Sequence, residues 1–140
     1  MPTRRTVVAG TVALATLMPG GVHAEGAAPV AMTRHGPVRG YLDGAIKVFK
    51  GVRYGADTSA RRFRAAVAPE RWTDPVDATA YGAASPQKSD EPNQSEDCLF
   101  LNVWTSGLND GGRRPVMVYV HGGAHANGSG SSPLYDGVRL

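Results

Sequence analysis

The chain has 140 residues, of which 41% are hydrophobic and 19% are charged, a composition that is ordinary for one globular domain. Its formal charge is +3 at pH 7, but Arg4 and Arg5 lie in the first 24 residues, so the remainder carries only +1. This balance gives no support to a nucleic-acid-binding function. Cys98 is the only cysteine, which excludes an intrachain disulfide.

Residues 1–24 are predicted to be an export signal and not part of the fold. Arg4 and Arg5 give a basic start, an apolar stretch follows at 7–18, and small residues lead up to residue 25. This order is typical of a signal peptide with twin-arginine character. The apolar stretch is shorter than the ~20 residues that span a bilayer as a helix, so a lasting membrane anchor is the less favoured alternative. We therefore expect a bacterial protein exported to the periplasm or the extracellular space.

Short strands are predicted after a small-residue linker at 25–30. The sequence alternates over 31–34, 37–42 and 45–50, and turn-forming pairs interrupt it at Gly36-Pro37 and at Asp43-Gly44. Asp-Gly between two such segments is a strong hairpin signal. These segments predict an antiparallel meander at the edge of a sheet.

Residues 53–95 show no sustained helical or strand period and are predicted to form a long ordered loop region. The run Arg61-Arg-Phe-Arg64 within it is interpreted as solvated charge, because the charge of the whole chain is nearly balanced.

Two further strands are predicted at 98–105 and 116–120, separated by an exposed turn rich in Asn, Asp and Gly. The second is an uninterrupted apolar run with three valines, which is typical of a strand covered on both faces of a sheet. We expect both strands to be central, and Cys98 to be a small buried residue. The predicted fold class is α/β, with the edge meander leading into the central strands.

The residues that follow the last strand predict a site for negative charge. Gly122 and Gly123 allow the backbone to turn so that successive N–H groups point into one cavity, as acyl-transfer chemistry requires. His121 and His125 have the spacing of two metal ligands on a helix, but the glycines between them disfavour a helix, so neither a metal nor another cofactor is expected. The glycines at 128 and 130 lack the spacing of a phosphate-binding loop.

His121-Gly-Gly-Ala124 resembles the oxyanion loop of α/β-hydrolase lipases and esterases, and the closest likeness is to type-B carboxylesterases and cholinesterases. The segment from Ser95 to Trp104 resembles the other N-terminal signature of that family. The likeness extends over nearly all of the chain after residue 30 and includes Gly51-Val-Arg-Tyr-Gly55, Arg62-Phe63, Trp72, Ala80-Tyr-Gly82 and Pro86-Gln87. The sequence departs from the pattern at Arg53, where Pro is common, at Phe100, where Tyr is usual, and at His125, where an aromatic residue is usual.

The resemblance implies a secreted serine carboxylesterase that acts on small carboxylic esters. By this likeness the backbone N–H groups of Gly123 and Ala124 bind the oxyanion, while His121 and Gly122 support the loop. The nucleophile of this fold lies in a G-x-S-x-G motif, which the 140 residues do not contain. Residues 25–140 are therefore expected to be the N-terminal portion, roughly the first quarter, of a truncated α/β-hydrolase domain, without esterase activity of its own.

The resemblance also implies a structural ion pair between Arg62 and Glu96. The neighbouring apolar residues, Phe63 and Leu99, are expected to turn toward the core and bring the two charges to a partly buried boundary. Arginine suits that position because its planar guanidinium can hold a carboxylate with two hydrogen bonds.

Two alternatives remain at the level of sequence. Some relatives of this family keep the fold for adhesion and have lost the nucleophile, so the chain could belong to a non-catalytic binding protein. It could also be the inactive product of a truncated reading frame.

Overall fold

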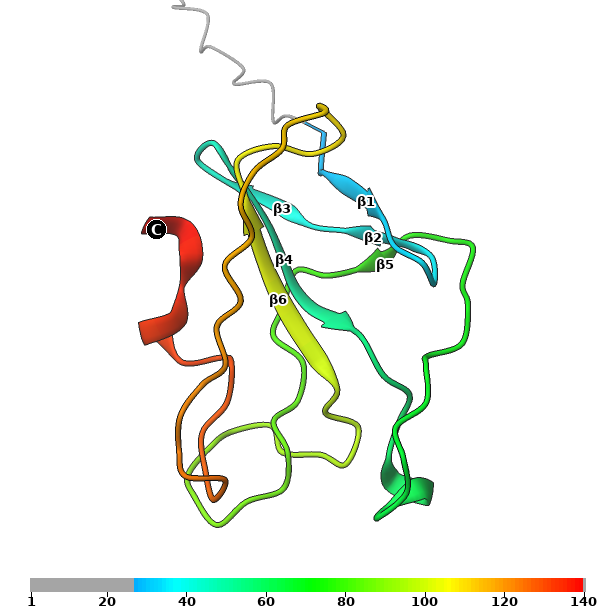
Figure 1. Ribbon diagram of the computed structural model, residues 1–140, viewed down its shortest axis with the longest axis vertical. Helices are drawn as coiled ribbons and strands as arrows, with labels where there is room; N and C mark the ends of the chain where they lie inside the picture. Colours follow the sequence, from blue (N-terminus) through cyan, green and yellow to red (C-terminus); the bar gives the residue numbers. More distant parts are fainter. Residues whose placement is uncertain (1–26, 140) are drawn as a thin grey trace, which may run out of the picture.

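The computed structural model describes residues 27–139 (Figure 1), and the predicted export signal at 1–24 lies outside this range. Six short strands form two three-stranded sheets. The first sheet contains β1 (Val30–Met32), β2 (Pro37–Arg39) and β5 (Val76–Asp77), and the second contains β3 (Tyr41–Asp43), β4 (Ile46–Arg53) and β6 (Phe100–Thr105). Three 3₁₀ helices complete the structure: η1 (Ser59–Arg61), η2 (Pro133–Tyr135) and η3 (Gly137–Arg139). Within the described range, no helix is long and apolar enough to cross a bilayer.

The predicted hairpin is confirmed, because β3 and β4 pair antiparallel around a two-residue turn at Gly44 and Ala45. Gly44 has a φ of 58°, which a residue with a side chain adopts only at a cost. The predicted strand at 37–42 is wrong in one respect, since it divides at Gly40 into β2 and β3 of different sheets. The reason is a change of partner: β2 pairs with β1 and β5, whereas β3 pairs with β4. Gly40 lies between them in a close approach, since a Cβ there would lie 2.2 Å from the Val48 carbonyl oxygen.

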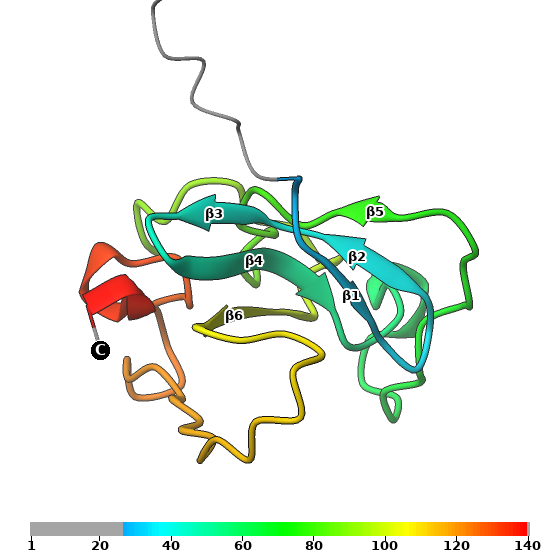
Figure 2. The same cartoon turned by 90° about the horizontal axis from the view of Figure 1, so that it is seen from above.

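A small core lies where the two sheets meet. Val38 of β2, Phe49 of β4 and Ala78, just after β5, are buried against one another, and Val48 is fully buried nearby. Trp72 packs against this cluster and donates a hydrogen bond from Nε1 to the Pro37 carbonyl oxygen at 2.7 Å. Figure 2 shows the first sheet with β1 and β2 crossing beside β4. The core therefore joins the meander to the long loop region.

Residues 53–95 are mostly ordered loop, as predicted, but they also contain η1 and the two-residue strand β5. β5 pairs parallel with β2, with Val38 opposite Val76 and Arg39 opposite Asp77. The sheet of the meander is thus completed by a strand that comes from the loop region. No local pattern predicts so short a strand, since only its partner defines it.

The predicted central strands differ from the structure. Residues 116–120 do not join either sheet, and their side chains are between 63% and 85% exposed. β6 lies at the edge of its sheet, paired only with β4. A central strand needs ladder partners and a covering layer on both faces, and residues 27–139 supply neither for this segment (Figure 1). This part of the chain also contains no α-helix, so the helices expected of an α/β fold are not visible in it.

Candidate functional site

The backbone turns sharply directly after the exposed apolar segment. Gly123, Ala124 and His125 have φ angles of 120°, 52° and 58°, three successive residues in conformations that favour glycine. The Gly123 carbonyl oxygen accepts bonds from the N–H groups of Ala126 at 2.9 Å and Asn127 at 3.2 Å. Within residues 27–139, the N–H groups of Gly123 and Ala124 donate to no protein acceptor.

The two glycines of this turn have different steric requirements. A Cβ on Gly123 would lie 1.8 Å from the Asn127 carbonyl oxygen, so no larger residue fits without opening the turn. Gly122 has no atom within 4 Å of the same position. The turn therefore depends on glycine at 123 and tolerates a side chain at 122.

His121 is half-buried and lies before the turn. Its Nδ1 lies 2.8 Å from the Gly122 carbonyl oxygen, a contact in which Nδ1 donates and the ring is held against the backbone. His125 is exposed. Within residues 27–139, no group of three or more His, Cys, Asp or Glu side chains could hold a metal ion.

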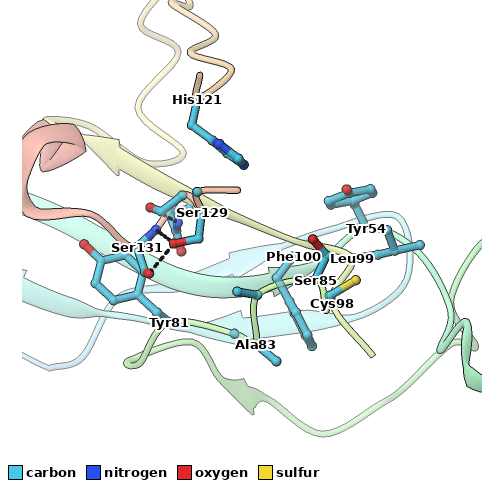
Figure 3. A pocket seen from close by; sticks show the side chains of 15 residues that line it. Tyr54, Tyr81, Ala83, Ser85, Cys98, Leu99, Phe100, His121, Ser129 and Ser131 are labelled. Carbon is cyan, nitrogen blue, oxygen red and sulfur yellow. Dashed lines mark hydrogen bonds between the residues drawn. The ribbon is translucent and has the colours of Figure 1, made fainter. Parts of the chain in front are cut away.

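A pocket of about 210 Å³ lies next to the turn, between residues 81–85, the start of β6 and the loop at 128–131. Figure 3 shows His121 and Ser129 on one side of this pocket and Cys98, Leu99 and Tyr54 on the other. Gly123 and Ala124 do not line the pocket. The structure thus places His121 in the pocket wall and the predicted oxyanion donors beside it.

The loop at 128–131 forms one wall of the pocket and is held there by hydrogen bonds. It is not a phosphate-binding loop. Ser129 is only 8% exposed, and its hydroxyl bonds the Glu91 carboxylate and lies 2.6 Å from the Ser131 hydroxyl. A carboxylate at this position repels a phosphate. Among residues 27–139, no histidine is hydrogen-bonded to Ser129, so its hydroxyl has no imidazole base in this part of the chain.

Cys98 is half-buried where we predicted a buried residue. Burial raises the pKa of its thiol, and the carboxylates of Glu96 and Asp97 raise it further. The thiol therefore stays protonated near neutral pH and is a poor nucleophile.

Arg62 Nη1 lies 3.0 Å from Glu96 Oε1, so the two side chains are in contact. The environment differs from the expected one, because 60% of the Arg62 side chain is exposed and Phe63 is 99% exposed. The expectation that Phe63 turns toward the core is wrong. Phe63 has a φ of 59° and lies in a surface loop, with the Arg62 guanidinium 5.4 Å from its ring centroid.

Sequence reasoning missed a second, better-bonded ion pair at Arg53. Its Nη1 and Nη2 donate to the two carboxylate oxygens of Asp97 at 2.5 Å and 2.7 Å, and about a third of each side chain is exposed. The hydrogen bond from Arg53 lowers the pKa of Asp97. The guanidinium also lies 4.5 Å from the ring centroid of Phe100. The only signal in the sequence was that Arg53 and Phe100 both depart from the family pattern, and the structure shows that they touch.

Comparison with known proteins gives a consistent result. The model of the family described as "Carboxylesterase family" matches residues 27–140. The chain is 42% identical over 120 residues to para-nitrobenzyl esterase of Bacillus subtilis (strain 168), covering 79% of this chain and 24% of that protein. It is 41% identical over 119 residues to phenmedipham hydrolase of Pseudarthrobacter oxydans, covering 76% of this chain and 24% of that protein. The chain thus spans about a quarter of the length of these relatives.

Solved structures agree with the sequence comparison. A structure of PNB esterase superposes with a TM-score of 0.71 at 44% identity, covering 77% of this chain and 23% of that one. The carboxylesterase of Geobacillus stearothermophilus gives a TM-score of 0.70 at 41% identity, covering 77% of this chain and 22% of that one.

Proposed function

Because the chain belongs to the carboxylesterase family, we propose that it furnishes the oxyanion-binding turn of a secreted serine carboxylesterase. The N–H groups of Gly123 and Ala124 bind the negatively charged oxygen of the tetrahedral intermediate that forms when a serine attacks the ester carbonyl. The serine, the acid and the catalytic histidine come from residues other than these 140. No step of this reaction requires a metal or another cofactor.

The observation that carries the proposal is the turn itself. Its successive positive φ angles leave two neighbouring N–H groups without an acceptor among the described residues 27–139, and Gly123 fits only as glycine. Backbone donors need no particular side chain, so Ala124 serves as well as glycine. Fixed N–H groups of this kind stabilise developing negative charge at no cost in reorganisation, and loss of one donor typically lowers turnover by ~10²- to 10³-fold.

The proposal is tested in a hybrid esterase, in which residues 27–140 replace the matching segment of Bacillus subtilis para-nitrobenzyl esterase. We expect the hybrid to hydrolyse a p-nitrophenyl ester and the isolated 140-residue chain to show no hydrolysis above a host-lysate control. Gly123→Ala should lower kcat by ~10²-fold or more. Lys88→Ala, at an exposed residue outside the turn, is the control and should stay within a few-fold of the unsubstituted hybrid.

A folded hybrid without activity would contradict the proposal, and so would a Gly123→Ala variant with unchanged kcat. The hybrid keeps the serine, acid and histidine of its larger part, so the result reports on the contribution of the grafted segment alone.

Export is the second part of the proposal. Arg4, Arg5 and the apolar stretch at 7–18 support a twin-arginine signal. Residues 1–26 fused to a folded reporter should carry it out of the bacterial cytoplasm, and replacement of both arginines by lysine should retain it inside. Equal export of both fusions would exclude the twin-arginine route.

A further inference from the structure

We propose that Gln87 and Glu91 are positioning residues for the oxyanion turn, which they hold through the loop at 128–131. This inference rests on the proposed function, because it concerns the same turn. Both residues lie in the long loop region, remote in sequence from the turn, and they are hydrogen-bonded to the loop that follows it.

Gln87 binds both backbone groups of Gly128. Its Oε1 accepts a hydrogen bond from the Gly128 N–H at 2.6 Å, and its Nε2 donates to the Gly128 carbonyl oxygen at 3.0 Å. A side-chain amide that engages the N–H and the C=O of one residue fixes the position and the orientation of that peptide unit. No other residue type among the twenty presents this donor and acceptor at the same reach.

Glu91 binds the next part of the loop. The hydroxyls of Ser129 and Ser131 both donate to its Oε1, the second at 2.9 Å. On the side of β6, Asn102 Nδ2 donates to the Gly130 carbonyl oxygen at 3.1 Å. Every residue from 128 to 131 is therefore bonded to a side chain from another segment.

Gln87 is itself held in place by hydrogen bonds within its own segment, residues 87–94. Its backbone N–H donates to Gln94 Oε1 at 2.7 Å, and Gln94 Nε2 donates to the carbonyl oxygens of Ser89 and Glu91 at 3.1 Å and 2.9 Å. Ser89 Oγ donates to Gln87 Oε1 at 3.0 Å. The segment 87–94 is thus a preformed bracket, and little conformational entropy remains to be lost when it binds the loop.

Gly128 connects the bracket to the oxyanion turn. A Cβ on Gly128 would lie 3.0 Å from the Gly122 carbonyl oxygen and 3.1 Å from His121 Nδ1, so its backbone packs directly against both residues. The turn closes one residue earlier, where the Asn127 N–H donates to the Gly123 carbonyl oxygen. A shift of Gly128 therefore moves both ends of the turn whose N–H groups bind the oxyanion.

The expected effect on catalysis is intermediate in size. Gln87 and Glu91 do not touch the oxyanion, so their loss leaves the N–H donors present but displaced. A misplacement of about 1 Å can lower turnover by ~10²-fold, so we expect Gln87→Ala to lower kcat by about tenfold to a hundredfold.

The first test is hydrogen–deuterium exchange in the full 140-residue chain, read on peptides that cover residues 121–131. We expect protection at Ala126, Asn127 and Gly128, whose N–H groups are hydrogen-bonded, and clearly faster exchange at these residues in Gln87→Ala. Lys88→Ala is the matched control, because Lys88 is the exposed neighbour and should leave the exchange unchanged. Exchange at free-peptide rates in the unsubstituted chain, or equal exchange in Gln87→Ala, would overturn the proposal.

The second test measures kcat and KM in the hybrid esterase. Gln87→Ala should lower kcat with KM within about twofold, and Lys88→Ala should change neither. Glu91→Ala should lower kcat, while Glu91→Gln, whose Oε1 still accepts from both serines, should restore it to within a few-fold. Equal kcat in all variants would overturn the positioning role. If the hybrid is inactive but Gln87→Ala still accelerates exchange, the proposed function is rejected, while the role of residues 87–94 in holding the loop is supported.

Discussion

Arg53 links two of the three positions at which the sequence departs from the carboxylesterase pattern. It bonds Asp97 with both of its terminal nitrogens and lies over the ring of Phe100. A guanidinium interacts with the face of an aromatic ring, so phenylalanine serves here without the hydroxyl of tyrosine. Arg53 and Phe100 are thus a matched pair, which ties the end of β4 to the segment that leads into β6.

The two ion pairs of this region should contribute very differently to stability. In the hybrid esterase, Asp97→Asn should lower the free energy of unfolding by about 1.5–3 kcal/mol, because it removes charge-assisted hydrogen bonds and leaves Arg53 partly buried. Glu96→Gln should cost less than about 1 kcal/mol, since most of the Arg62 side chain is in solvent. Urea unfolding of the two variants measures the difference, and equal costs would contradict this ranking.

The same measurement at low pH provides a control. The pKa of Asp97 is lower in the folded state than in the unfolded chain, so its contribution is fully present above an unfolded pKa of about 3.9 and is lost as the pH falls through the lower folded value. The destabilisation caused by Asp97→Asn should therefore shrink below about pH 4. Destabilisation that is independent of pH would assign the effect to packing.

At the scale of elements, local turn chemistry was predictable and long-range pairing was not. The hairpin between β3 and β4 follows from Gly44 and the alternation around it. β5 is defined as a strand by its pairing with β2, and no sequence pattern predicts a two-residue parallel strand. The apolar run at 116–120 fits a central strand only when both of its faces are covered, and its pattern does not say which segments would pair with it or cover it.

The candidate site divides in the same way. The turn at 121–124 was predictable because the glycines that it needs are adjacent in sequence. The bracket that holds it was not, since Gln87 and Glu91 act from some 40 residues away and polar side chains in a loop carry no periodic signal. Phe63 is a different kind of error: its apolar side chain predicts burial, but the structure shows it exposed.

Glycines in β4 and its hairpin offer an element-scale prediction. Gly51 has a φ of 69° at the irregularity where the β4–β6 register shifts, and a Cβ there would lie 2.6 Å from the Ala80 carbonyl oxygen. Gly51→Ala in the hybrid esterase should cost at least about 2 kcal/mol of unfolding free energy, from backbone strain and the clash. Gly44→Ala should cost only about 1 kcal/mol, because its positive φ is accompanied by open space. Thermal melts of both variants compare them directly, and a Gly44→Ala cost as large as that of Gly51→Ala would show that the clash adds nothing.

The exposed apolar residues determine how we expect the isolated chain to behave in solution. The segment 116–120 is solvent-exposed, and within residues 27–139 β6 is paired along one edge only. Exposed apolar segments and unpaired strand edges promote association in soluble proteins. The isolated chain should therefore bind a hydrophobic dye and associate as its concentration rises, measured by dye fluorescence and light scattering.

The hybrid esterase is the control for that surface, because its larger part can cover the segment. It should show little dye fluorescence at the same concentration. A monomeric isolated chain with a sharp cooperative melt and no dye binding would contradict the prediction.

The loop that carries Phe63 lies, in sequence, between strands that pair with each other. β2 pairs with β5 and β4 pairs with β6 across this loop, so neither half of the chain contains a complete sheet. Arg62 and Arg64 are exposed there, where trypsin cuts. A single cut should yield two pieces that still elute together from a sizing column and separate only in denaturant. The covalent connection at this loop is then dispensable for holding the structure together, and the chain can be nicked there without coming apart.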